Sequence, residues 1–121
     1  MNVPEIEKFG RPIAFSRLRG EQWLPTPVVA ETYYGVATVR SDMMESEVRN
    51  RLLGYPRIKI DEEIARTAGQ LLAQADDASG GDGGIGPNDA YIAATAEVLD
   101  DSVLTDNVRD FEELRVSVET Y

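Results

Sequence analysis

The chain has 121 residues, of which 42% are hydrophobic, and this is enough for one domain with a single core. It contains no cysteine and no histidine, so disulfide bonds, cysteine nucleophiles, histidine bases and most zinc sites are excluded. Carboxylates are then the remaining candidates for acid–base or metal chemistry, and their oxygen atoms favour hard cations such as magnesium or manganese.

The net charge of −10 is unevenly distributed along the chain. Residues 1–60 carry nine basic and seven acidic side chains, whereas residues 61–121 carry three basic and fifteen acidic side chains. An acidic protein is a poor nonspecific binder of nucleic acid, so any such contact would depend on local cations. The candidates, for each of which solvated surface charge is the simpler interpretation, are Arg40, Arg49, Arg51, Arg57 and Lys59.

The sequence contains no sign of a membrane segment. No apolar run approaches the roughly 20 residues that cross a bilayer. Residues 1–7 also lack the basic and then apolar pattern of a signal peptide. We therefore expect a soluble, cytoplasmic protein with no membrane contact.

The first half of the chain predicts helices on either side of a short strand. Residues 4–18 are expected to form a short helix that is interrupted near Gly10 and Pro12. A longer helical stretch follows over residues 27–53, with Thr26 as its N-cap and a break near Ser41. Residues 55–60 alternate as a strand does, and Asp61 then caps another helix. The apolar face of that helix is formed by Ile64, Ala68, Leu71, Leu72 and Ala75.

The second half predicts a loop, a buried helix and two strands. Residues 75–87 are rich in glycine and aspartate and are expected to form a mobile loop. Residues 87–99 fit a buried helix, residues 102–105 a short apolar strand, and residues 114–118 another strand. Alternating strands and helices indicate a parallel sheet that is covered on both faces. We therefore predict a single α/β domain over residues 1–121, with a three-layer α/β/α architecture.

Glu31 stands alone in apolar sequence. It is the only charged residue between Pro25 and Val39. Burying an unpaired charge costs several kcal/mol, so this carboxylate should be protonated, paired or bound to a cation in a cleft. The simpler structural alternative is an ion pair with an arginine such as Arg57.

Asp89 lies in the first turn of the helix predicted over residues 87–99. A negative charge suits this end of a helix, so capping is its structural alternative. However, Ile92, Ala93 and Ala96 follow it at the spacing of one helix face. Asp89 should therefore open the apolar face and point toward the sheet.

A third polar cluster follows the strand predicted over residues 102–105. It contains Asp106, Asn107 and Asp110. In an open α/β sheet, residues just past the carboxyl end of a strand line the usual ligand crevice. Asp110 could equally cap the short helical turn that starts near Phe111.

Three blocks together resemble the body of VapC-type PIN-domain toxins: PTPVVAETYYGVA, IDEEIARTAGQLLAQ and GPNDAYIAATAEVLDDSVLTDNVRDFEEL. The match covers about residues 22–118. The resemblance implies a ribonuclease that uses magnesium or manganese, held by acidic side chains, to cut single-stranded or looped RNA. It also implies a cognate antitoxin and a homodimer as protein partners.

By motif position, Glu31 resembles the second acid of the family and Asp89 the third. The fourth polar position falls on Asn107 or Asp110, with Asp106 one place earlier, and the sequence does not choose among them. The resemblance thus implies Glu31, Asp89, Asp106 and Asp110 as catalytic residues. The same residues, with Asn107, are the implied metal ligands.

The first acid of the family has no counterpart in this sequence. Residues 1–20 contain no aspartate, and their only acids are Glu5 and Glu7. We therefore expect the first, central strand of the family fold to be missing, in a chain that is either shortened or degenerate. The strands near Trp23 and Val103 would then have unpaired edges across a gap, and nuclease activity would be severely reduced or absent.

Two other functions compete with a metal-dependent endoribonuclease. One is a noncatalytic PIN-like interaction module that dimerises or binds an antitoxin through exposed apolar residues such as Tyr33, Tyr34, Met43 and Met44, although such residues are more often core. The other is an unrelated α/β domain with structural carboxylates.

Overall fold

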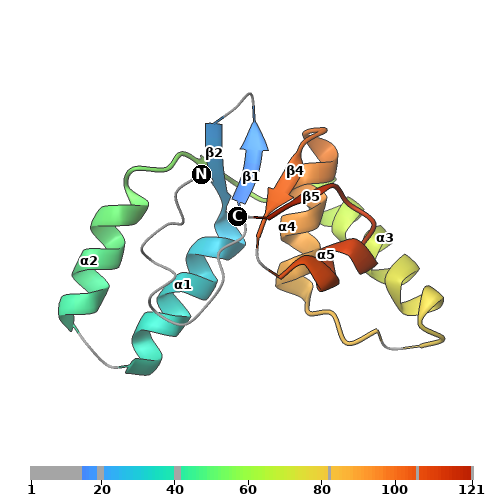
Figure 1. Ribbon diagram of the computed structural model, residues 1–121, viewed down its shortest axis with the longest axis horizontal. Helices are drawn as coiled ribbons and strands as arrows, with labels where there is room; N and C mark the ends of the chain where they lie inside the picture. Colours follow the sequence, from blue (N-terminus) through green and yellow to red (C-terminus); the bar gives the residue numbers. More distant parts are fainter. Residues whose placement is uncertain (1–14, 19–20, 40–41, 82, 106, 121) are drawn as a thin grey trace.

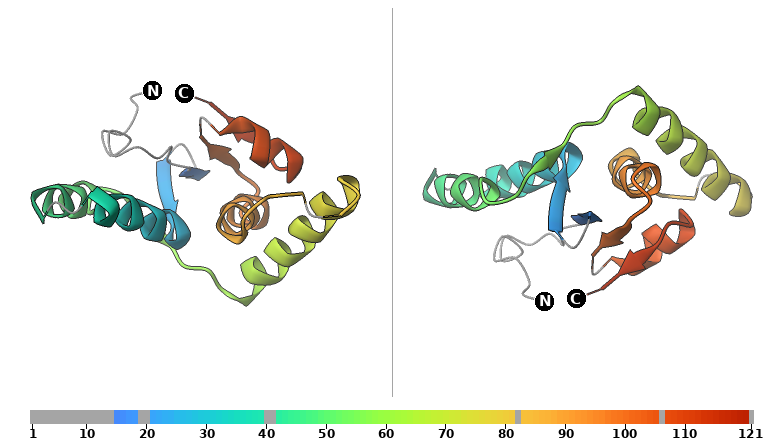
Figure 2. Two further views of the ribbon diagram at one scale, coloured as in Figure 1. Left: turned by 90° about the horizontal axis from the view of Figure 1, so that it is seen from below. Right: turned by 90° about the horizontal axis from the view of Figure 1, so that it is seen from above.

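The computed structural model describes residues 15–18, 21–39, 42–81, 83–105 and 107–120. Five strands form one sheet in the order β3-β2-β1-β4-β5, and helices pack around it (Figure 1). Helices α1 and α2 extend to one side of the strands and α3 to the other (Figure 2). This mixed α/β architecture confirms the predicted fold class. None of the helices in the described ranges is long and apolar enough to span a membrane.

The predicted helical stretch over residues 27–53 forms two helices, α1 (Thr26–Val39) and α2 (Asp42–Leu52). The expected break is confirmed by the helix bounds, although residues 40 and 41 themselves lie outside the described residues. Pro27 suits the first turn of α1 because its missing N–H would have had no partner within the helix. Val28 and Val36 of α1, and Val48 and Leu52 of α2, are buried in the core.

Helix α3 (Glu62–Ala78) begins as the sequence predicts. The Asp61 carboxylate accepts a hydrogen bond of 2.9 Å from the Ile64 backbone N–H. This bond satisfies one of the amide groups that the first turn of a helix leaves without a partner. Four of the five predicted face residues are buried, and Leu72 packs against them while partly exposed.

The glycine-rich connection is shorter than predicted because α3 continues to Ala78. The Asp76 carboxylate accepts a hydrogen bond of 2.9 Å from the Gly83 N–H, and Ile85 is buried. Gly80, Gly81 and Gly84 have positive φ angles, which favour glycine. The loop is therefore tied to α3 at one end and to the core at the other, and its mobility stays a prediction.

Helix α4 (Pro87–Val98) is the central helix of the molecule. It contacts α1, α3, α5 and strands β1, β2 and β4. Its buried residues lie on most of its circumference and are mainly alanines, namely Ala90, Ile92, Ala93, Ala94, Thr95 and Ala96. Small side chains allow neighbouring elements to approach this helix closely.

The strands predicted over residues 55–60 and 102–105 are present with shorter bounds, whereas residues 114–117 of the strand predicted over 114–118 are not in a strand. Strand β3 covers Arg57–Ile58, β4 covers Ser102–Leu104 and β5 covers Val118–Glu119. A short helix, α5 (Val108–Glu113), lies between β4 and β5. Strand β2 (Glu21–Pro25) is the strand expected near Trp23.

Strand β1 (Phe15–Leu18) corrects two predictions. Residues 15–18 form a strand and not the end of a helix, and residues 4–14 lie outside the described residues. Ser16 is paired with Trp23 of β2 and also with Val103 of β4, so the two edges expected to face each other across a gap are both occupied. The backbone groups of a sheet must find partners, and this four-residue segment provides them.

The pairing of β1 is antiparallel on both sides, so the sheet is mixed and not wholly parallel. Strands β2 and β4 therefore run in the same direction as each other. Since β3 is parallel to β2 and β5 to β4, these four strands share one direction. Their carboxyl ends meet at one edge of the sheet.

A proline substitution in β1 tests whether this strand is paired on both sides. We expect Ser16→Pro to lower the free energy of unfolding by more than about 2 kcal/mol, because proline removes a ladder hydrogen bond from a strand paired on both sides. Ser16→Ala keeps the backbone N–H and is the matched control. Urea denaturation of both variants measures the effect, and equal stability would show that β1 is not a central strand.

Candidate functional site

The described candidate residues belong to three segments that reach the edge of the sheet where β2 and β4 end. Helix α1 follows β2 directly, and Asn107 follows β4 after Thr105 and Asp106. Helix α4 leads into β4 and packs against it, so the start of α4 lies at the same edge. The shared direction of β2 and β4 thus brings three distant segments of the chain to one side of the molecule.

Glu31 is half-buried in the second turn of α1 and lines an open cavity of about 360 Å³. The other lining residues are Ala30, Tyr34 and Asn88. Asn88 belongs to α4 and immediately precedes Asp89. The cavity therefore places the predicted second acid beside the helix turn that carries the predicted third acid.

Arg57 has a structural role in the connection after α2. Its guanidinium donates a hydrogen bond of 2.6 Å to the Leu52 carbonyl and another to the Tyr55 carbonyl. These carbonyls lie at and just beyond the end of α2, where carbonyl groups have no partner within the helix. The Arg57 guanidinium is therefore bonded to backbone carbonyls, which gives it a structural role in place of the RNA contact considered for it.

The other cations suggested for nucleic-acid contact are only partly described. Arg49 and Lys59 are exposed, as a solvated charge would be. The side chains of Arg40 and Arg51 lie outside the described residues.

Asp89 is half-buried in the first turn of α4. Ile92, Ala93 and Ala96, which follow on the same helix face, are fully buried. Asp89 therefore stands at the start of the buried face, as its spacing predicts. A carboxylate there also interacts favourably with the positive end of the helix dipole.

The third cluster is organised by hydrogen bonds around Asn107. Its side-chain Nδ2 donates to Asp110 Oδ2 at 3.2 Å, and its backbone N–H donates to Thr105 Oγ1 at 3.0 Å. Asn107 is the residue that precedes α5, so Asp110 lies inside the helix and does not cap it. Asp106, the remaining candidate of this cluster, lies outside the described residues.

The described residues supply oxygen donors of the kind that hard cations prefer, but in separate groups. Glu31 shares a cavity with Asn88, and Asn107 is bonded to Asp110. Among the residues that the structure describes, no three acidic side chains lie close enough together to form a metal-binding group. The donor chemistry thus fits magnesium or manganese, while a complete ligand set would need further residues such as Asp106.

Sequence reasoning missed Asn88 and Thr105. Asn88 stands beside Asp89 in the sequence, but its place in a cavity with Glu31 depends on the packing of α1 against α4. Thr105 is buried, and it supports the backbone of Asn107. The position of this polar residue directly after an apolar strand could have identified Thr105 from the sequence.

The chain matches the family model described as PIN domain over residues 8–116. It belongs to the PIN-domain family. The comparison with curated proteins gave no match.

Solved structures agree with this PIN-domain assignment. The chain is 28% identical to FitAcB from Neisseria gonorrhoeae, with a TM-score of 0.62, covering 79% of this chain and 72% of that one. It is also 28% identical to FitAB bound to an IR36 DNA fragment, with a TM-score of 0.61, covering 81% and 71% of the two chains. VapBC2 from Rickettsia felis, bound to a DNA fragment from its promoter, shares the fold with a TM-score of 0.70 at 23% identity, covering 82% and 74%.

The hydrogen bond from Asn107 to Thr105 can be tested by substitution. We expect Thr105→Val to lower the free energy of unfolding by about 1 kcal/mol and to speed hydrogen exchange at the Asn107 amide, because valine lacks the acceptor oxygen. Thr105→Ser keeps that oxygen, so the Asn107 amide should keep its protection in this control even if stability falls. Equal exchange in the valine variant and the unaltered protein would contradict the assignment.

Proposed function

We propose that this PIN-domain protein is a divalent-cation-dependent endoribonuclease of the VapC toxin type. The observation that carries the proposal is the cavity in which Glu31 of α1 meets Asn88, the neighbour of Asp89 on α4. Glu31 lines this opening, and Asp89 belongs to the helix turn that supplies Asn88 to it. Open α/β sheets bind their ligands at the carboxyl edge of their strands.

Glu31 and Asp89 would hold the cation, together with one or more of Asp106, Asn107 and Asp110. A bound magnesium or manganese ion would supply activation of water and stabilisation of charge on the phosphate. The protein's own contribution is to hold oxygen donors in fixed positions. For Asp110 this orientation comes from the hydrogen bond that Asn107 Nδ2 donates to its Oδ2.

We propose that cleavage is slow, because the central strand brings no carboxylate to the site. Strand β1 has the sequence FSRL, and its reversed direction puts Phe15, paired with Leu104, at the edge where β4 ends. The resemblance implies an aspartate at the end of this central strand. Magnesium requires near-ideal octahedral ligation, so a missing carboxylate should weaken both binding and catalysis.

A noncatalytic interaction module is the second candidate function. It is favoured by the absence of a three-acid group within the described part of the chain and by the lack of a carboxylate in β1. In either function, we propose a cognate antitoxin and a second copy of the chain as protein partners. The 28% identity to FitAB supports a protein partner.

Cleavage of a mixed RNA pool tests the nuclease directly. We expect slow, manganese-dependent cleavage that falls at least about 100-fold in Glu31→Gln and in Asp89→Asn, because each variant removes a charged ligand but keeps the shape of the side chain. Glu97→Gln, on the exposed side of α4, is the matched control and should cleave normally.

Two outcomes would contradict the proposed nuclease. Cleavage that persists unchanged in both variants would place the chemistry elsewhere. No cleavage by a well-folded sample would favour the noncatalytic module.

A further inference from the structure

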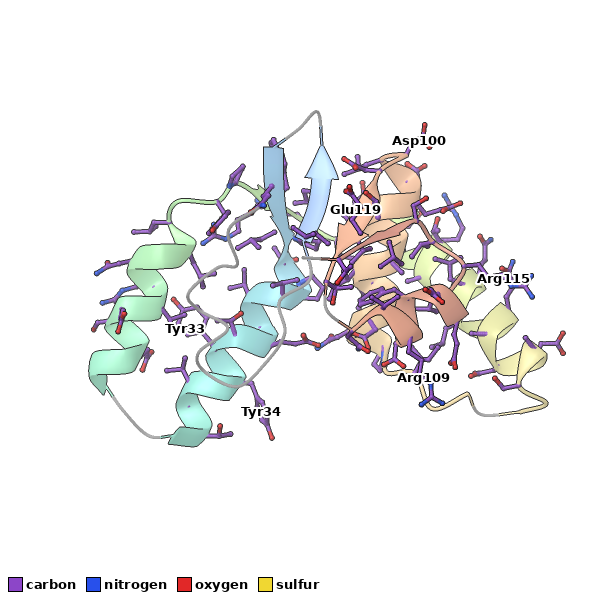
Figure 3. The ribbon with its side chains drawn as sticks, in the orientation of Figure 1. Tyr33, Tyr34, Asp100, Arg109, Arg115 and Glu119 are labelled. Carbon is purple, nitrogen blue, oxygen red and sulfur yellow. The ribbon has the colours of Figure 1, made fainter. Side chains whose placement is uncertain are left out.

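Tyr34 is an exposed aromatic residue beside the candidate acids. Its side chain is 61% exposed, and with Leu53 it is one of two large hydrophobic residues exposed in the described part of the chain. It points outward from α1, whereas Tyr33 is directed toward α2 (Figure 3). Tyr33 is half-buried and packs against the core, so the two neighbouring tyrosines have different roles.

The position of Tyr34 links it to the cavity of Glu31. They are three positions apart along α1, which puts both on the same face of the helix. Both residues line the open cavity of about 360 Å³, with Asn88 contributed by α4. An exposed aromatic ring therefore lies next to the carboxylate proposed to hold the cation.

We propose that Tyr34 binds one base of a single-stranded RNA by stacking, beside the bond that is cut. This inference rests on the proposed nuclease function and adds a substrate-binding residue to it. A base presents its uncharged π face to an aromatic ring regardless of its identity. Bases of double-stranded RNA are already stacked and cannot reach such a ring, so the residue selects unpaired nucleotides.

The charge of the protein favours stacking over phosphate contacts. The net charge is −10, and the lining residues of this cavity include a carboxylate and no lysine or arginine. Phosphate contacts through cations, which supply much of the affinity of most nucleic-acid binders, are therefore not available from these residues. Stacking of a base on Tyr34 needs no cation beside Glu31, and the Asn88 amide can both donate to and accept from the edge of a base.

Substitution of Tyr34 separates the ring from its surroundings. We expect Tyr34→Ala and Tyr34→Leu to weaken binding of a short single-stranded oligoribonucleotide roughly tenfold, since one stacked base is lost. Tyr34→Phe keeps the ring and should bind normally. Leu53→Ala, at the other exposed apolar residue, is the matched control and should also bind normally.

Two measurements distinguish base stacking on Tyr34 from nuclease activity. The first is quenching of 2-aminopurine in the oligoribonucleotide, measured with EDTA so that no metal-dependent cleavage occurs. The second is steady-state cleavage with manganese, in which Tyr34→Ala should raise KM about tenfold and leave kcat near normal. Tyr34-dependent quenching without any cleavage would support the stacking role and refute the nuclease.

Three results would overturn the stacking role. Normal cleavage with an unchanged KM in Tyr34→Ala would refute it and leave the nuclease standing. Absence of quenching by the unaltered protein would refute it as well. Unchanged oligoribonucleotide binding, combined with loss of self-association in sedimentation, would make Tyr34 a protein contact instead.

Discussion

Strand β1 joins two pairs of parallel strands, and the position of the candidate ligands depends on that junction. Its backbone is paired with β2 on one side and with β4 on the other. Because both pairings are antiparallel, β2 and β4 keep a common direction although the strand between them is reversed. The start of α1 and the start of α4 therefore remain at the same edge of the sheet, where Glu31 and Asp89 lie.

The reversed direction of β1 also limits the number of carboxylates at the edge where β2 and β4 end. A reversed central strand satisfies the backbone of its neighbours as well as a parallel one, because the hydrogen bonds do not depend on the side chains. It does not, however, end at the edge where β2 and β4 end. The fold and the ligand set are thus separable: FSRL can complete the sheet without contributing a carboxylate.

The helices were predictable because their signals are local. Asp61 and the apolar spacing after it specify α3, and Pro87 with the following alanines specifies α4. Glu31 was singled out as a charge in apolar sequence and Asp89 from the spacing of the buried helix face, and their roles in a site stay predictions. Strand β1 was not predicted, because four residues carry little periodicity and one of its two partners, β4, lies far along the chain. The contribution of Asn88 depends on helix packing, which no local pattern reports.

We propose that one divalent cation binds between the segments of Glu31 and Asp89, and paramagnetic broadening of amide signals by manganese would detect it there. At substoichiometric manganese, the amide signals of residues 29–34 and 88–92 should broaden first, and Glu31→Gln should abolish this effect. Asp76 and Asp77, which line a separate open depression with Gly80 and Gly81, offer the internal comparison. Broadening that begins around residues 76–81, or that is unchanged in Glu31→Gln, would contradict the account.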